Sequence, residues 1–328
     1  MKIINKFLLI SHIVFLASTF CSASNSVKDG LLWKISGNGL NAPSYLFGTG
    51  HGISMVSVTS VLDRIPHFYD AFSSVHQLIV ERDLIDNNNY NKLELDMDST
   101  YANYLNKEDK AYLDHILMKY IKISSDKLKL KPVYIIDMIK TKKSVEMYRD
   151  MLFKEFKPNG DVDEITLLEL NHTSEVPMDF QLILKGKSAN YLIIGLDDLI
   201  GFNLEKSASD GQPMSKQIEE MIRILKTNTL DSIIQNRLVL NKPLRDAYLK
   251  QDLDELEQCL AKSNLENNIP PELIDMIGID RNKKWMEHIP KLISEQASLI
   301  AVGAAHLPGK DGLINLLKLQ GFTVEPVN

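Results

Sequence analysis

Two stretches of this chain share one pattern, Tyr45-Leu46-Phe47-Gly48-Thr49-Gly50-His51 and Ile300-Ala301-Val302-Gly303-Ala304-Ala305-His306. Each has three apolar residues, a glycine, two small residues and a histidine. Gly-x-x-His alone is a weak signal, but two copies that both follow an apolar run are rare by chance. Each copy is typical of a buried strand that enters a sharp turn, where glycine bends the backbone without a Cβ clash. The sequence therefore predicts two equivalent strand ends, each followed by a histidine.

The segments around these two stretches predict a sheet at both ends of the chain. The N-terminal segments are a hairpin of residues 31–35 and 44–47, a helix over 56–73 and a buried strand over 77–80. The C-terminal segments are a buried strand over 298–302, a helix capped by Asp311 that stops at Gly321, and a strand over 322–327. Strand, helix and strand in this order form a crossover unit. We therefore predict an α/β (α+β) fold with a central sheet built from two related β-α-β halves.

The middle of the chain is mostly helical in pattern. Apolar residues at helical spacing predict helices over residues 107–120, 133–156, 178–184, 213–226, 229–240, 244–260 and 281–296. One buried strand, residues 191–194, interrupts them. We expect a helical insertion over about residues 102–290 that covers the sheet.

The N-terminus has the pattern of a secretory signal peptide. Lys2 and Lys6 precede an apolar run over residues 7–20, and small residues follow at Cys21-Ser22-Ala23. We therefore predict a signal peptide at residues 1–23, a single domain at 24–328, and export to the periplasm or the medium. Cys21 leaves lipidation open as the alternative to simple cleavage. No other apolar run is long enough to span a bilayer, so no transmembrane segment is expected in the mature chain.

Composition excludes several classes of protein. The chain has 328 residues, 37 basic against 43 acidic, with a net charge of -6 and no long Lys/Arg run, which disfavours a nucleic-acid partner. Without residues 1–23 a single cysteine, Cys259, remains, so no intramolecular disulfide can form. The Gly-x-Ser-x-Gly, Walker A and dinucleotide-binding patterns are all absent.

The candidate chemistry lies where the predicted strands end. Ligands of open α/β sheets bind at the carboxyl edge of the strands. If the two halves lie side by side, His51 and His306 face one pocket, and Glu81, which ends the strand over 77–80, reaches the same rim. Two imidazoles and a carboxylate suit a divalent transition metal. They equally suit general acid–base catalysis without a metal.

These motifs carry a resemblance to a known family. Leu32-Trp33-Lys34-Ile35-Ser36-Gly37 with the first Gly-x-x-His stretch resembles the opening of the TraB/PrgY/GumN family. The second stretch with Leu307-Pro308-Gly309 resembles its closing motif, and Arg281-Asn282 ahead of Trp285 resembles a third element. The family is grouped with Tiki proteases and erythromycin-esterase-like proteins.

The resemblance implies one active site, often metal-dependent, built from His51, Glu81 and His306, with Arg281 as a further candidate. The family commonly has Leu-Glu after its central strand, where this chain has Leu196-Asp197.

Together these features predict a metal-assisted hydrolase. His51 and His306 hold a divalent ion of the Mn, Co or Zn type, Glu81 ligates the ion or acts as the base, and Arg281 steadies a carboxylate or oxyanion. The substrate, a peptide or small ester, rests on the resemblance alone. The alternative is a non-catalytic binding protein for a metal, haem or a peptide signal.

Overall fold

The computed structural model describes residues 30–50, 61–83, 100–155, 178–202, 212–227 and 229–327. These residues form two compact units, a sheet unit (30–50, 61–83, 178–202 and 240–327) and a helical unit (100–155, 212–227 and 229–239). The predicted signal peptide lies outside the described residues, so the predicted domain boundaries stay predictions. Within the described part, no helix is both long and apolar enough to cross a bilayer.

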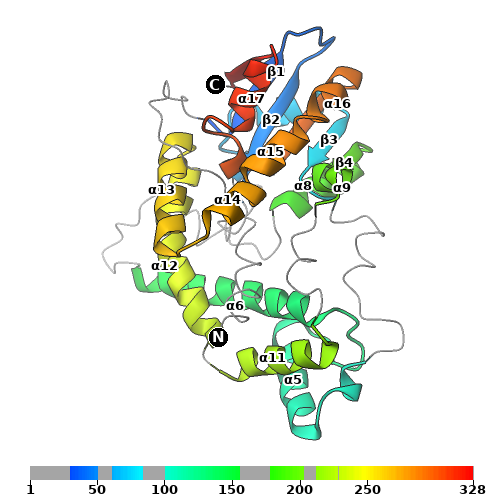
Figure 1. The fold of residues 1–328 in the computed structure, drawn as a ribbon, viewed down its shortest axis with the longest axis vertical. Helices are drawn as coiled ribbons and strands as arrows, with labels where there is room; N and C mark the ends of the chain where they lie inside the picture. Colours follow the sequence, from blue (N-terminus) through cyan, green and yellow to red (C-terminus); the bar gives the residue numbers. More distant parts are fainter. Residues whose placement is uncertain are drawn as a thin grey trace. The chain divides into compact units, whose positions relative to one another are not determined.

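Six strands form one mixed sheet in the sheet unit (Figure 1). They are β1 (Leu32–Ser36), β2 (Ser44–Thr49), β3 (Gln77–Val80), β4 (Leu192–Gly195), β5 (Ser298–Gly303) and β6 (Thr323–Pro326). Their order is β4-β3-β5-β2-β1-β6. The β4-β3-β5-β2 strands run parallel, whereas β1 is antiparallel to both β2 and β6. The predicted α/β fold, the hairpin and every predicted strand are confirmed.

The two predicted halves interleave within this sheet. β5 lies between β2 and β3, so the crossover through α3 (Phe68–Ser73) passes over a strand from the other end of the chain. The crossover from β5 through α17 (Leu313–Leu319) to β6 passes over both β2 and β1. Gly48 is paired with Val302 in the β2–β5 register. A Cβ on Gly48 would lie 3.0 Å from Ala304, so the glycine allows the two Gly-x-x-His segments to pack directly together.

Burial explains why these short apolar runs form the centre of the sheet. Every residue of β3 and β5 is buried, as expected for parallel strands covered on both faces. At the amino ends of the strands, buried polar side chains satisfy one another. The Gln77 amide donates to Ser298 Oγ (3.1 Å), and the Ser298 backbone N–H donates to Ser44 Oγ (3.0 Å). These hydrogen bonds join β2, β3 and β5 at the edge of the sheet opposite Glu81 and His306.

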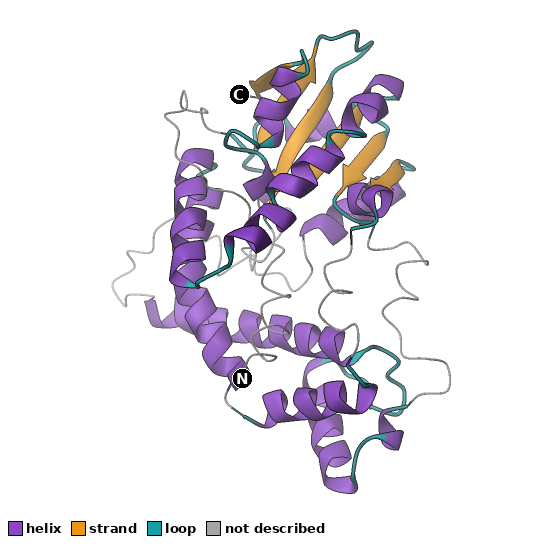
Figure 2. Ribbon diagram, in the orientation of Figure 1, coloured by secondary structure: helices purple, strands orange, loops and turns teal. Residues whose placement is uncertain are grey.

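Other helices of the sheet unit pack around the sheet and beyond the carboxyl ends of its strands, together with the last part of α12 (Thr229–Leu249) (Figure 2). They are α8 (Met178–Ser188), α9 (Leu196–Ile200), α13 (Leu253–Glu266), α14 (Pro271–Ile277), α15 (Ile279–Trp285) and α16 (Ile289–Glu295). A short 3-10 helix, Ala304–His306, follows β5 directly and contacts α13. Thus α9 and the 3-10 helix each begin at the carboxyl end of a parallel strand.

The helical unit has its own core. It contains α5 (Lys107–Tyr120), α6 (Pro132–Glu155), α11 (Met214–Lys226), the 3-10 helix Tyr101–Asn103 and the first part of α12 (Thr229–Leu249). Apolar side chains of all four α-helices form one cluster that includes Leu113, Ile139, Met221 and Ile234. The boundary between the two units falls inside α12, between Val239 and Leu240.

Several predicted helix limits were wrong. In the described part of residues 56–73, residues 61–62 are helical, but the helix is interrupted and α3 begins only at Phe68, after His67 in a left-handed conformation (φ 55°). The helix predicted over 178–184 continues to Ser188, and the one predicted over 244–260 is interrupted between Leu249 and Leu253. The predicted break before Leu244 is absent, since α12 continues through Pro243 to Leu249. The predicted helix over 281–296 is two helices, α15 and α16, separated at residues 286–288. Finally, Gly312 rather than Asp311 is the N-cap of α17.

Candidate functional site

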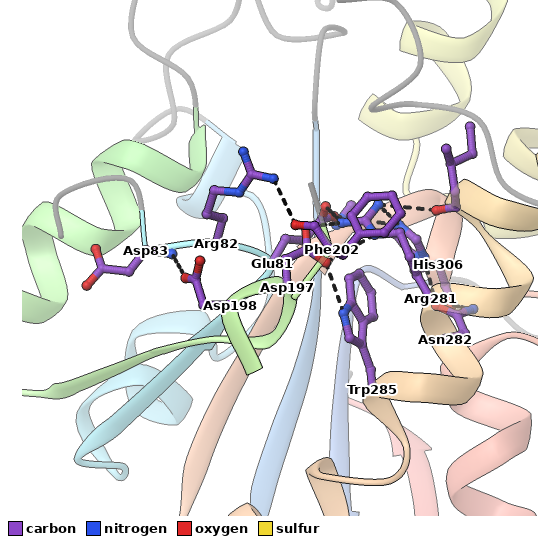
Figure 3. Close-up of polar contacts among 12 residues, drawn as sticks. Glu81, Arg82, Asp83, Asp197, Asp198, Phe202, Arg281, Asn282, Trp285 and His306 are labelled. Atoms are coloured by element: carbon purple, nitrogen blue, oxygen red, sulfur yellow. Dashed lines mark hydrogen bonds and ion pairs between the residues drawn. The ribbon is translucent and has the colours of Figure 1, made fainter. Parts of the chain in front are cut away.

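The site gathers at the carboxyl ends of neighbouring parallel strands (Figure 3). Glu81 follows β3, Asp197 follows β4 at the start of α9, and His306 ends the 3-10 helix that follows β5. Arg281 reaches them from α15. His51, which follows β2, lies outside the described residues.

Arg281 joins the two carboxylates. Its Nη2 donates to Glu81 Oε2 at 2.5 Å and to Asp197 Oδ2 at 2.9 Å, and its Nε donates to Asp197 Oδ1 at 3.2 Å. Nη1 also donates to the Ile277 carbonyl at 3.2 Å. Arg281, Glu81 and Asp197 are only 4%, 7% and 4% exposed. A buried guanidinium of this kind is stable only because its donors are paired with charged acceptors.

Aromatic rings complete the surroundings of this arginine. Its guanidinium carbon lies 4.5 Å from the centroid of Trp285 and 4.9 Å from that of Phe202. The Trp285 indole N–H donates to Asp197 Oδ1 at 3.1 Å. The rings therefore exclude water while contributing cation–π attraction and one further hydrogen bond.

Backbone groups fix Glu81 in place. The Gly303 N–H donates to Glu81 Oε1 at 2.8 Å, and the Asp197 N–H donates to the Glu81 carbonyl at 2.8 Å. Glu81 therefore connects the ends of β3, β4 and β5.

His306 lies beside this ion cluster and is 3% exposed. Its Nε2 is 3.3 Å from Arg281 Nη1 and 3.7 Å from Glu81 Oε1. Its Nδ1 is 2.7 Å from Asn282 Oδ1, and its ring centroid is 4.6 Å from that of Trp285. The ring thus presents one nitrogen to the charged groups and the other to a neutral amide.

The ionised groups of the cluster shift one another's pKa values. Burial raises the pKa of Asp197 to about 6, an effect that the charges of Arg281 and Arg82 oppose and that of Glu81 increases. Burial acts against the charged form of Arg281, but Glu81 and Asp197 outweigh it and raise the pKa of this group. The carboxylates and the guanidinium therefore depend on one another for their charged forms.

The structure brings together three of the four predicted site residues, Glu81, Arg281 and His306. Three others belong to the cluster, although the sequence did not assign them a role: Asp197, Asn282 and Trp285. Asp197 carried a signal, since it lies three residues after the predicted buried strand over 191–194, near the same edge of the sheet as Glu81.

The described residues do not by themselves fit a divalent metal. No group of three or more His, Cys, Asp or Glu side chains is arranged to hold one within the described ranges. The Nε2 atom of His306, the donor that a metal would use, has the Nη1 group of Arg281 at 3.3 Å. A cation that bound there would have to displace the guanidinium.

Comparison with known proteins places the chain in a family. Residues 31–326 match the model of the TraB/PrgY/gumN family, so the chain belongs to this family. No curated protein and no solved structure matches it significantly.

Proposed function

We propose that this protein is an exported hydrolase of peptide or ester bonds whose reactive groups lie at the carboxyl edge of the sheet. The observation that carries the proposal is the buried Glu81–Arg281–His306 cluster, in which an imidazole nitrogen lies beside a paired carboxylate and guanidinium. Buried ion clusters with perturbed pKa values are typical of catalytic sites. Membership of the family supports the same reaction class by analogy.

His306 is the group that this arrangement favours as the base. The sequence predicted Glu81 as a metal ligand or as the base, but its two carboxylate oxygens accept short hydrogen bonds from Gly303 and Arg281. The Nη1 donor beside Nε2 of His306 is farther away, at 3.3 Å. In the proposed reaction Nε2 of His306 takes a proton from water as the water oxygen attacks the carbonyl carbon. The tetrahedral intermediate then releases the amine or alcohol, which receives that proton from His306.

The charged neighbours assist this proton transfer. The carboxylate of Glu81, at 3.7 Å from Nε2, stabilises the imidazolium that forms. Arg281 holds Glu81 and Asp197 in place. When water binds, the Nη1 group of Arg281 moves away from Nε2 of His306, so that the lone pair of Nε2 can accept the proton.

A divalent metal of the predicted Mn, Co or Zn type needs donors beyond the described residues, with His51 as the second imidazole. The catalytic steps above therefore use protein groups alone. Metal dependence is a separate part of the proposal, and the chelation experiment below tests it.

A second candidate is a binding protein for a metal, haem or a peptide signal. The burial of Glu81, Asp197 and Arg281 and the hydrogen bonds among them favour this candidate. Such a cluster can also serve as a rigid support for a ligand. Tight binding without turnover would distinguish this candidate from the hydrolase.

The test compares hydrolysis of a mixed peptide library and of chromogenic esters by the wild type, His306→Gln and Glu81→Gln. His76→Gln is the matched control, since His76 is an exposed histidine of the same unit. We expect both site variants to lose at least about 100-fold in kcat/KM and the control to keep full activity. Full activity in His306→Gln would refute the assignment.

Two further measurements test metal dependence and export. Chelator treatment followed by addition of Mn²⁺, Co²⁺ or Zn²⁺ tests the metal, and activity that survives thorough chelation would exclude a metal-dependent reaction. The N-terminal mass of the protein recovered from cells tests export. Loss of residues 1–23, or a lipid on Cys21, would support it, and an intact N-terminus would contradict it.

A further inference from the structure

Asn282 holds a position that nothing in the proposed reaction uses. It lies on α15 next to Arg281, is 1% exposed, and has three polar contacts. Its Nδ2 donates to the His306 carbonyl at 3.2 Å and to the Asp311 carbonyl at 2.9 Å, and its Oδ1 lies 2.7 Å from Nδ1 of His306.

These contacts fix which way the amide faces. With the amide rotated by 180°, Oδ1 would face two carbonyl oxygens, which are acceptors and cannot donate to it. Both contacts would become repulsive in a buried site, and two backbone carbonyls would lose a donor. The orientation with Nδ2 toward the carbonyls is therefore the stable one.

The amide orientation in turn determines the proton of the imidazole. An amide oxygen only accepts, so the 2.7 Å contact is a hydrogen bond only when Nδ1 of His306 carries the hydrogen. A neutral ring with hydrogen on Nδ1 has its lone pair on Nε2. The contact of the other ring nitrogen is consistent with this tautomer, because the Nη1 group of Arg281, which is a donor, lies 3.3 Å from Nε2.

We propose that Asn282 is a positioning residue that keeps neutral His306 in the tautomer with hydrogen on Nδ1, and so commits Nε2 as the reactive nitrogen. The catalytic consequence rests on the proposed function, whereas the tautomer does not. In proteins that use histidine, loss of a group that orients the ring typically lowers function 10- to 100-fold. The wrong tautomer is known to abolish most of the rate in other histidine-dependent enzymes.

The experiment reads the tautomer directly. Protein labelled with ¹⁵N-histidine is measured by long-range ¹H–¹⁵N correlation at a pH where the His306 ring is neutral, and its signal is assigned by its loss in His306→Gln. We expect a protonated Nδ1 and an unprotonated Nε2 in the wild type. A wild-type ring with hydrogen on Nε2 would overturn the proposal without any variant.

Two substitutions then test the role of Asn282. Asn282→Leu removes the acceptor and should populate the other tautomer. Asn282→Asp keeps an acceptor oxygen beside Nδ1 and should retain hydrogen there, but its second oxygen faces the His306 and Asp311 carbonyls, so this variant should also be less stable. Asn315→Leu is the matched control, since that asparagine amide also donates to a backbone carbonyl, but in an exposed position. An unchanged His306 signal in folded Asn282→Leu would show that Asn282 does not set the tautomer.

Kinetics separate this inference from the proposed function. If the protein hydrolyses a substrate, we expect Asn282→Leu to lower kcat about 10- to 100-fold with KM changed less than about twofold. If no substrate is turned over, the NMR result still decides the tautomer, and only the proposed function fails.

Discussion

Replacing Arg281 by methionine tests the central interaction of the site. Methionine keeps much of the apolar stem that packs on Trp285 but removes the guanidinium. Five polar contacts disappear: two to Asp197, one each to Glu81 and the Ile277 carbonyl, and one to Nε2 of His306. Two buried carboxylates then lose the guanidinium that both of them contact.

The size of the effect follows from this burial. Removing one partner of a buried ion pair costs about 3–5 kcal/mol, because the charge left behind is desolvated and uncompensated. At about 2–4 °C per kcal/mol, the melting temperature of the sheet unit should fall by roughly 6–20 °C at neutral pH. In the variant the pKa of Asp197, which burial already raises and Arg281 no longer lowers, rises further above its unfolded value. Its stability therefore recovers as the pH falls toward 4, and the deficit is smaller at pH 5 than at pH 8.

The measurement is thermal and urea unfolding followed by circular dichroism at both pH values. Arg223→Met is the matched control, because Arg223 pairs with Glu220 on the surface of α11 with its side chain 42% exposed. An exposed pair of this kind contributes at most about 1 kcal/mol. A loss below about 1 kcal/mol in Arg281→Met, or a deficit that grows on acidification, would refute the reasoning.

Three further outcomes are expected. Gly50→Ala should destabilise the protein by about 1–3 kcal/mol, because the new Cβ would lie 3.0 Å from the buried ring of Tyr248, and Tyr248→Leu should relieve part of that cost in a double-mutant cycle. Burial raises the folded-state pKa of Asp197 to about 6, above the ordinary value of 3.8 for this side chain, so its contribution to stability is full below pH 4 and is lost as the pH rises to 6. Asp197→Asn should abolish this pH dependence of stability. The difference in unfolding free energy between pH 4 and pH 7, measured by urea unfolding, is up to about 3 kcal/mol in the wild type. Trp285→Phe removes the indole donor to Asp197 and should cost about 1–3 kcal/mol in the same assay, whereas a neutral result would show that this hydrogen bond contributes little.

The strands could be predicted from the sequence because each is a short apolar run bounded by glycine or polar residues. The predicted helix over 107–120 was confirmed, with Asn106 as its side-chain cap. Helix interruptions were harder to predict. The left-handed His67 has no sequence signal of the kind that glycine gives, and Pro243 is tolerated within α12 because a proline removes only one helical hydrogen bond.

The part of the site that the order of the strands determines could be predicted from the sequence. Glu81 and His306 each follow a buried parallel strand, so the shared carboxyl edge brings them together. Arg281 was found through the resemblance rather than through the topology. The hydrogen bonds of Asp197, Asn282 and Trp285 depend on how α9 and α15 pack against the sheet, and no spacing in the sequence encodes that packing.

The position of β5 has a consequence for how this chain acquires its structure. The strand made from residues 298–303 lies in the interior of the sheet, between two strands that are synthesised more than 200 residues earlier. Until it emerges, β2 and β3 have no common neighbour, and such distant pairing folds slowly. The order of synthesis thus makes assembly of the sheet a late event. A nascent chain that ends before residue 298 lacks the element that joins its two early strands, so shortening the gene from its 3′ end should yield aggregation rather than a smaller folded protein.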